Sequence, residues 1–562
     1  ATASLLKGVR LRAEQQDTRK HSELADGLVR ALGSLQVFTG PGDDFERVAR
    51  ELAAITPEQC HAAFKKSWDT ADVQVFIGGN LKLEQAPSTI LAAYRESAQQ
   101  PVAAAKQHEG AAFAYTQFGA QGTVIKRSEV KDLGITQVVF SNNVRANIKQ
   151  TDFEKNSVRL MATFGGGKLE AVAAKPGIIP FAQSVFPLAG LEKHSVDDLR
   201  RIFASQTVSM EFAVGDDSFV LAGKTTPQDF EAQCQRLCAN LVAPGWRVEA
   251  ERQFQKNLDS IYTELEHTAE GVMQNTVVGF IHSGDQRFAF PKREVMAGRN
   301  LADLKEWLAP ALSESYMEVA VVGDSEIEKT IEVLARTFGA IPKRAEKQKD
   351  YTEARKVPFP TEPQDHDIGF ATEIPRAYAL AYWPTADMLD IKRTRRLILL
   401  GDVLDDRLRL KIREELGETY SPASYHVASD TFTGYGYMTA MATLKPEQVA
   451  KVKPMFLDIA KNIGRGITAD EFQRAREPQL QQLVQMRRDN RYWITRVLVN
   501  CQSQPYRLDW SRSLVDDFSG IKKEDLEILA TQFLGSERAL TIGLMPHEGA
   551  APENASKGAF NK

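Results

Sequence analysis

The alternation of apolar and polar positions predicts many helices and strands, and the clearest helical stretch runs from Asp402 to Glu415. Apolar side chains recur there at every fourth position, with charged side chains between them, which is the pattern of an amphipathic helix. Gly417 should end this helix. Tyr420 then leads into a segment rich in Thr, Tyr and Val that favours a strand. The pattern therefore predicts Arg413 on the last helical turn and Tyr420 just beyond it.

A helix followed by a strand that ends in glycine occurs three times. The three pairs are Thr56–Lys66 with Val73–Gly79, Asn300–Ala311 with Glu318–Gly323, and Lys522 onward with Ala539–Gly543. The closing glycines are 323 − 78 = 245 and 543 − 323 = 220 residues apart, so each repeat has the size of a domain. Helices and strands alternate as in an α+β protein made of repeated sandwich-like domains, each an antiparallel sheet covered by helices.

The repeat also suggests domain boundaries. Residues 1–80 hold about the last third of one copy, so we expect a C-terminal remnant of a preceding domain, especially as Ala1 to Arg30 looks like the interior of a helix. Residues 81–122 contain the probable helix Pro87–Gln99 and a small, polar stretch that fits a linker. Residues 123–343 and 344–562 are expected to be two further domains.

Within these two domains, the pattern predicts more elements. The expected strands are Gly134–Phe140, Val144–Lys149, Val158–Thr163, Tyr378–Trp383 and Asp430–Met438. The expected helices are Met388–Leu399, Glu447–Ile463 and Asp470–Val499. The glycine run at 165–167 is interpreted as a turn, because it lacks the spacing of a phosphate-binding loop.

Charge and composition exclude several classes of function. The 562 residues carry 70 Lys plus Arg against 74 Asp plus Glu, a formal charge near −4, so no nucleic-acid partner is indicated. No apolar run is long enough to span a membrane, and the N-terminus has no signal-peptide pattern. The four cysteines are too scattered for a disulfide scaffold. Cys234 and Cys238, four residues apart, are interpreted as buried thiols on one helix face.

Arg413 and Tyr420 allow two interpretations. In the first, Arg413 only complements the negative end of the helix dipole and Tyr420 is a half-buried strand residue. In the second, the motif Arg-Glu-x-x-Gly-x-x-Tyr that starts at Arg413 has a functional role. It resembles the signature in the C-terminal half of the pitrilysin and insulin-degrading family of zinc metallopeptidases. This resemblance implies a half of a clamshell in which the arginine and the tyrosine seven positions later (420 − 413 = 7) bind peptide substrate.

The zinc motif of that family, His-x-x-Glu-His, is missing from this chain. Aligned on Gly190, its three positions are Phe181, Ser184 and Val185, and none of these side chains can ligate zinc or act as a base. Glu251, where the third ligand would be sought, is expected to be a solvated helix residue without partners. Four histidines are interpreted as surface or structural residues rather than ligands: His194, His267, His282 and His426.

The resemblance implies a chain without catalytic residues of its own and without a metal site. It would be the C-terminal, non-zinc-binding portion of a zinc metalloendopeptidase, with zinc held in an N-terminal catalytic half of the same protein or of a partner chain. The alternative is a non-catalytic structural or assembly subunit of a metallopeptidase-like complex. The expected ligand is a peptide. The compartment stays open, with the bacterial periplasm only a starting assumption.

Overall fold

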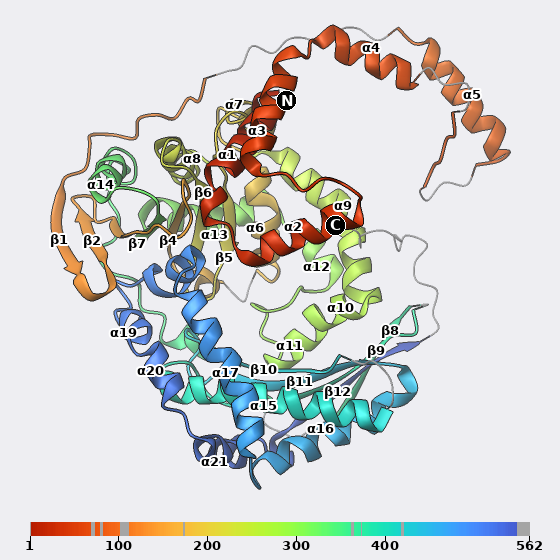
Figure 1. The fold of residues 1–562 in the computed structure, drawn as a ribbon, viewed down its shortest axis with the longest axis vertical. Coiled ribbons are helices and arrows are strands. Elements are labelled where there is room, and N and C mark those ends of the chain that lie inside the picture. The colour runs from red at the N-terminus through yellow and green to blue at the C-terminus, as the bar shows by residue number, and fades with distance from the viewer. Residues whose placement is uncertain are drawn as a thin grey trace. The chain divides into compact units, whose positions relative to one another are not determined.

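The structure is a computed structural model. It describes residues 2–68, 73–78, 83–101, 112–171, 175–360, 365–372, 374–416 and 421–547. Its contacts divide the chain into two units, one made of residues 1–114, 197–206 and 552–562 and the other of residues 115–196 and 207–551. The larger unit contains two sheets with their helices (Figure 1), and the predicted α+β class of repeated sheet-and-helix sandwiches is confirmed.

The smaller unit is largely helical. Its helices are α1 (Thr2–Glu14), α2 (His21–Gly33), α3 (Pro41–Ala54), α4 (Pro57–Trp68) and α5 (Ala86–Gln99). The predicted start of α4 is confirmed, because Thr56 and Gln59 exchange side-chain and backbone hydrogen bonds. The predicted strand Val73–Gly79 is wrong for its described residues 73–78, which form no ladder. A strand needs neighbours to pair with, and the described residues of this unit supply none.

The first sheet of the larger unit has seven strands in the order β1-β2-β3-β7-β4-β6-β5. The strands are β1 (Val124–Val130), β2 (Ile135–Phe140), β3 (Arg145–Gln150), β4 (Val158–Phe164), β5 (Glu211–Val214), β6 (Phe219–Thr225) and β7 (Met317–Gly323). Neighbours are antiparallel except β3 and β7. We call this sheet and its helices the seven-stranded lobe.

The second sheet has five strands in the order β10-β11-β9-β12-β8. The strands are β8 (Asp365–Ala371), β9 (Ala377–Pro384), β10 (Ala423–Ala428), β11 (Gly436–Leu444) and β12 (Leu540–His547). Only β12 and β8 are parallel neighbours. We call this sheet and its helices the five-stranded lobe.

The two sheets repeat one topology. The order β3-β7-β4-β6-β5 of the first corresponds, strand by strand, to β8-β12-β9-β11-β10 of the second. The predicted closing strands Glu318–Gly323 and Ala539–Gly543 are confirmed as β7 and β12, and each lies between a parallel and an antiparallel neighbour. The connection from β4 to β5 therefore corresponds to the connection from β9 to β10, and the candidate residues lie in these two connections.

Helices cover the sheets and bury a core in each lobe. The larger helices of the seven-stranded lobe are α6 (Ile178–Val185), α8 (Phe230–Val242), α9 (Val248–His267), α13 (Leu301–Glu314) and α14 (Ile327–Arg336). Those of the five-stranded lobe are α15 (Ile391–Leu416), α16 (Val449–Ile463), α17 (Ala469–Met486), α19 (Tyr506–Arg512), α20 (Leu514–Ser519) and α21 (Lys523–Phe533). Their apolar sides pack into two clusters, one around Phe140, Phe181 and Phe219 and one around Trp383, Leu404 and Phe456.

A buried carboxylate joins the two lobes. Glu318 on β7 is 1% exposed. It accepts hydrogen bonds from the backbone N–H groups of Gln502 (3.0 Å) and Ser503 (2.8 Å) in the five-stranded lobe. Within its own lobe, it also accepts from the Asn147 amide at 2.8 Å and the Tyr316 hydroxyl at 2.7 Å. A buried carboxylate needs such donors in place of water, so this contact contributes to holding the lobes together.

Four predicted elements differ in extent. The strand predicted at Asp430–Met438 starts only at Gly436, because Gly434 has φ +70° and the Ser429 hydroxyl accepts the backbone N–H groups of Thr431 and Phe432 in a turn. The helix predicted at Asp470–Val499 ends at Met486, and a short helix and a π-helix follow it. The helices predicted at Met388–Leu399 and Asp402–Glu415 are the single helix α15.

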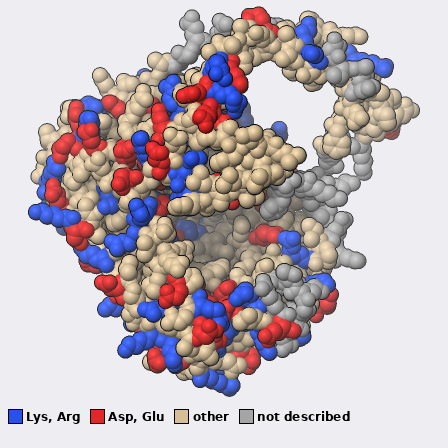
Figure 2. Space-filling view, in the orientation of Figure 1, with Lys and Arg blue, Asp and Glu red and all other residues tan. Residues whose placement is uncertain are grey.

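Cys234 and Cys238 are buried and unpaired, as predicted. None of the helices in the described part of the chain combines the length and the apolar character that a membrane span requires. On the face that Figure 2 shows, Lys and Arg side chains alternate with Asp and Glu, as the small net charge leads one to expect.

Candidate functional site

Helix α15 positions the first candidate residue, Arg413. Leu404, Leu408 and Ile412 on its inner side are fully buried, so the predicted amphipathic helix is confirmed. The backbone of Arg413 lies one turn before the last residue of the helix, Leu416. The side chain of Arg413, the predicted turn at Gly417 and Tyr420 are outside the described residues. The substrate role of the pair stays a prediction.

The helix runs without interruption through Gly401, which lies between the two helices that the sequence predicted. A Cβ atom there would lie 3.3 Å from both the Tyr425 Cα and the His426 backbone N of β10. The glycine is therefore tolerated inside the helix because it lets the strand approach closely.

One turn further along α15, three carboxylates have different partners. Asp402 accepts a hydrogen bond from the Gln479 amide at 2.8 Å, and burial raises its pKa to about 6. Asp405 accepts the backbone N–H of Ser424 at 2.9 Å, and burial raises its pKa as well. Asp406 instead pairs with Arg409 and Arg474, so its pKa is lowered despite partial burial. Asp405 alone of the three bonds the strand that follows the motif.

The four singled-out histidines are structural, as predicted. His426 on β10 lies 3.0 Å from the Thr385 hydroxyl, and burial together with Arg393 lowers its pKa to about 4. The ring of His282 is stacked between those of Phe288 and Tyr435, and burial likewise lowers its pKa to about 4. His267 bonds the Ala371 carbonyl. His194 is buried and meets the ring of Tyr115 edge-on. The imidazoles of His282 and His426 are neutral at pH 7.

The positions aligned with the zinc motif lie on α6, in the corresponding connection of the seven-stranded lobe. Phe181 and Val185 have no exposed surface and belong to the core. Ser184 donates to the Pro180 carbonyl at 2.8 Å. The outer side of α6 carries Pro180, Gln183 and Ser184. Neither the aligned positions nor the outer residues of α6 offer the imidazoles and carboxylate that zinc requires, so these residues do not fit the metal.

The prediction for Glu251 is wrong. Its carboxylate accepts the backbone N–H of Leu301 at 2.8 Å, at the N-terminus of α13. A carboxylate at that end of a helix satisfies an unpaired N–H and the helix dipole. Among the described residues, no group of three His, Cys, Asp or Glu side chains is arranged to hold a metal ion.

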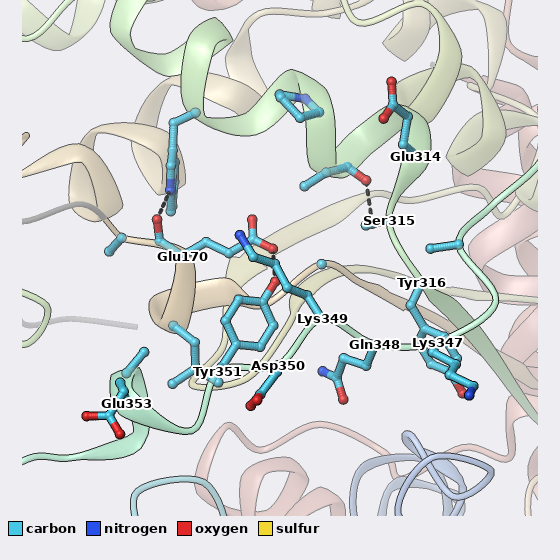
Figure 3. A pocket seen from close by; sticks show the side chains of 18 of the residues that line it. Glu170, Glu314, Ser315, Tyr316, Lys347, Gln348, Lys349, Asp350, Tyr351 and Glu353 are labelled. Atoms are coloured by element: carbon cyan, nitrogen blue, oxygen red, sulfur yellow. Dashed lines mark hydrogen bonds between the residues drawn. The ribbon is translucent and has the colours of Figure 1, made fainter.

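An open pocket of about 1290 Å³ lies in the seven-stranded lobe beside the segment that leads to the other lobe. In Figure 3, the hydroxyl of Tyr351 points at the carboxylate of Glu170 and donates a hydrogen bond to it. Trp307 donates to the Glu170 carbonyl at 2.9 Å, and Leu169 and Ala311 add apolar wall. Rim charges are of both signs: Lys175, Lys347, Lys349, Glu306, Glu314, Asp350 and Glu353.

The local sequence did not single out Tyr351 or Asp405. Tyr351 lies in a polar stretch without periodicity, and the only signal was the glycine run, since a Cβ on Gly166 would overlap the ring of Tyr351. Asp405 was one of several charged residues on a helix. Its contact to Ser424 depends on how the helix and the strand fold onto each other, which periodicity does not reveal.

Comparison with known proteins identifies the family that this chain resembles. Residues 300–478 match the model of the Peptidase M16 inactive domain, and this match includes Arg413 and Tyr420. The predicted resemblance to the C-terminal half of this family of zinc peptidases is thereby confirmed.

One curated relative is the chloroplastic stromal processing peptidase of Arabidopsis thaliana, 20% identical over 477 residues that make up 75% of this chain and 37% of that protein. The periplasmic protease PqqL from Escherichia coli has a similar structure, with a TM-score of 0.66 at 17% identity over 97% of this chain and 60% of PqqL. The ferredoxin protease FusC, solved with Arabidopsis ferredoxin, gives a TM-score of 0.66 at 14% identity over the same shares. The structural likenesses support the fold, and the chain spans 60% or less of these three proteins.

Proposed function

We propose that this chain, which carries the inactive domain of M16 peptidases over residues 300–478, is the non-zinc-binding part of a zinc metalloendopeptidase. It supplies the substrate-binding wall of a chamber that closes over peptides. Two observations support the proposal: the family match includes Arg413 and Tyr420, and the backbone of Arg413 lies at the end of α15.

In this proposal, Arg413 and Tyr420 act on the peptide backbone. The guanidinium of Arg413 donates hydrogen bonds to substrate carbonyl oxygens near the scissile bond. The hydroxyl of Tyr420 donates to a neighbouring carbonyl and steadies the oxyanion that forms during hydrolysis. Zinc and the general base come from an N-terminal catalytic half in the same protein or in a partner chain. Residues 81–122 link the halves, and closure excludes water from the chamber.

The first test is an intact mass and zinc analysis of the protein expressed from its complete reading frame. The proposal expects one zinc per protein in a form that contains a catalytic half, and no tightly bound zinc in the 562-residue chain. Arg413→Ala should then lower kcat/KM for a peptide by about tenfold to a hundredfold, as the loss of a hydrogen bond from a charged donor does, without releasing zinc. Arg409→Ala, one turn earlier on α15 and paired with Asp406, is the matched control.

Unchanged turnover in the Arg413→Ala and Tyr420→Phe variants would overturn the substrate role. A complete reading frame that encodes only this chain, together with no peptidase partner on purification, would favour the alternative of a structural or assembly subunit.

A further inference from the structure

A carboxylate that has no cation beside it lies in the open pocket of the seven-stranded lobe. Glu170 is half-buried and lines this pocket, and in Figure 3 its carboxylate projects into the open space. It accepts a hydrogen bond from the Tyr351 hydroxyl. Among the described residues, it forms no ion pair with a Lys, Arg or His side chain. A carboxylate partly removed from water is stabilised most by a charged donor, so a cation is the group that this position would bind best.

Two aromatic side chains lie beside Glu170, and both are held there by hydrogen bonds to it. The Trp307 indole donates to the Glu170 carbonyl at 2.9 Å, and the Tyr351 hydroxyl donates to the carboxylate. Burial, together with the bond to Glu170, raises the pKa of Tyr351, so its hydroxyl keeps its proton and remains the donor. Both residues line the pocket. Because aromatic rings attract cations to their faces, a cation bound to Glu170 meets a favourable wall.

The lysines of the pocket do not fill this position. Lys175 pairs with Glu306, so its charge is balanced within the wall. Lys349 on the rim places its ammonium 5.8 Å from the centre of the Tyr351 ring, within the range of a cation–π contact. Both lysines belong to the described residues, and neither forms an ion pair with Glu170. The position of Lys349 shows that this wall accommodates an ammonium group.

The size of the pocket favours a polypeptide over a small molecule. Its volume of about 1290 Å³ is larger than the roughly 300 to 1,000 Å³ typical of small-molecule sites. A second pocket of about 430 Å³ shares Leu169, Ala171 and Ile178 with it, so the two form one groove along a partly apolar wall. An extended chain fits such a groove with one side chain directed at Glu170.

We propose that this groove binds a polypeptide segment through a basic side chain, whose cationic group pairs with Glu170 beside the rings of Trp307 and Tyr351. Arginine fits best, because its planar guanidinium bonds a carboxylate through two N–H groups and also stacks on aromatic rings. The inference rests on the proposed function only in taking a polypeptide as the ligand. It involves neither Arg413 nor Tyr420.

The test compares two fluorescein-labelled peptides, Ala-Leu-Gly-Xaa-Gly-Leu-Ala, in which Xaa is arginine or citrulline. Citrulline has nearly the shape of arginine but no charge. Binding to the full 562-residue chain is measured by fluorescence anisotropy. The arginine peptide should bind about tenfold more tightly, as expected for one hydrogen-bonded contact to a charged group. Raising the salt concentration from about 50 mM to about 500 mM should reduce this preference.

Two variants locate the effect. Glu170→Gln keeps the shape of the side chain and an acceptor for the Tyr351 hydroxyl, so it should abolish the preference for arginine while leaving the urea unfolding midpoint nearly unchanged. Glu353→Gln is the matched control. It removes the same charge from the rim of the pocket, at a carboxylate already paired with Lys356 at 2.8 Å, and should leave the preference unchanged.

Equal affinity for the two peptides, or a preference that survives in Glu170→Gln, would overturn the inference. So would an equal loss in Glu170→Gln and Glu353→Gln, because the preference would then reflect overall charge. A photo-crosslinker next to the arginine should label tryptic fragments that contain Glu170 or Trp307, and labelling confined to other fragments would contradict this site. These results do not depend on turnover. An arginine preference that requires Glu170 therefore stands even if Arg413→Ala shows the proposed function to be wrong.

Discussion

The two lobes place different elements in corresponding connections of their two sheets, which share one topology. Between β4 and β5, the seven-stranded lobe has the short helix α6, whose inner side is part of the core. Between β9 and β10, the five-stranded lobe has α15, whose 26 residues extend to Arg413 and beyond. One topology thus holds a connection in which the aligned zinc positions serve packing and another with a much longer helix, whose backbone extends past Arg413.

The largest effect is expected when histidines are placed on α6 at the positions aligned with the zinc motif. Phe181→His with Val185→His should destabilise the protein by about 5 kcal/mol, because it removes core volume and buries polar rings without partners. Pro180→His with Ser184→His, which has the same spacing on the outer side, should cost far less. Urea unfolding followed by tryptophan fluorescence measures the difference. Equal midpoints for the two double variants would show that burial does not separate the two sides of α6.

A substitution at the contact between the lobes should have a smaller effect on stability. Glu318→Ala should lower the free energy of unfolding by about 3 kcal/mol, since it leaves several buried donors without an acceptor. Hydrogen exchange should then increase at Gln502 and Ser503, whose N–H groups bond Glu318. Glu328→Ala, an exposed carboxylate paired with Arg127, is the control and should change little. Unchanged exchange at both amides would mean that this carboxylate does not join the lobes.

The smallest expected effect is a dependence of stability on pH that arises from one residue of α15. The pKa of Asp402 is raised to about 6 by burial, above an unfolded value of about 3.9. The folded state therefore binds the proton on Asp402 more tightly than the unfolded state does. The contribution of Asp402 to stability is present below about pH 4 and is lost as the pH rises through 6. Asp402→Asn should stabilise the protein at pH 7.5 by about 1 kcal/mol and leave it unchanged at pH 4.

Helix α6 contains no ionisable side chain, so hydrogen exchange of α6 should not follow this titration while that of α15 should. Asp458→Asn, on the exposed side of α16, is the control substitution. A stability gain for Asp402→Asn that is the same at both pH values would contradict the assigned ionisation.

Periodicity and the glycine-ended strands predicted the fold class and the repeated closing strands, because these features are written in local sequence. The exact extent of the helices and strands depends on long-range packing. Two separate helices were predicted on either side of Gly401, yet Gly401 lies inside α15, where the strand β10 approaches closely. Tyr435 and Tyr437 are two residues apart as in a strand, but Phe432 and Tyr435 instead pack in a turn against Leu169 and Tyr351.

The candidate site could likewise be predicted only in part. The spacing at Arg413 left two interpretations open; the motif was recognised through its resemblance to a known family, and the family match supports that recognition. The buried state of Phe181 and Val185 could not be predicted, because an alignment assigns positions without saying which side of a helix meets the core. Asp405 and Ser424 are 19 residues apart, and nothing in either local sequence links them.

The position of the closing strands also sets an order of assembly. β7 and β12 are the last strands of their lobes along the chain, but each is inserted between two strands made much earlier. During synthesis, β8 must therefore wait beside β9 without a partner between them until residues 540–547 have been made. Such late, long-range pairing slows folding and prolongs the exposure of unpaired strand edges. The five-stranded lobe should thus depend more on chaperones while it emerges from the ribosome than its helical content suggests.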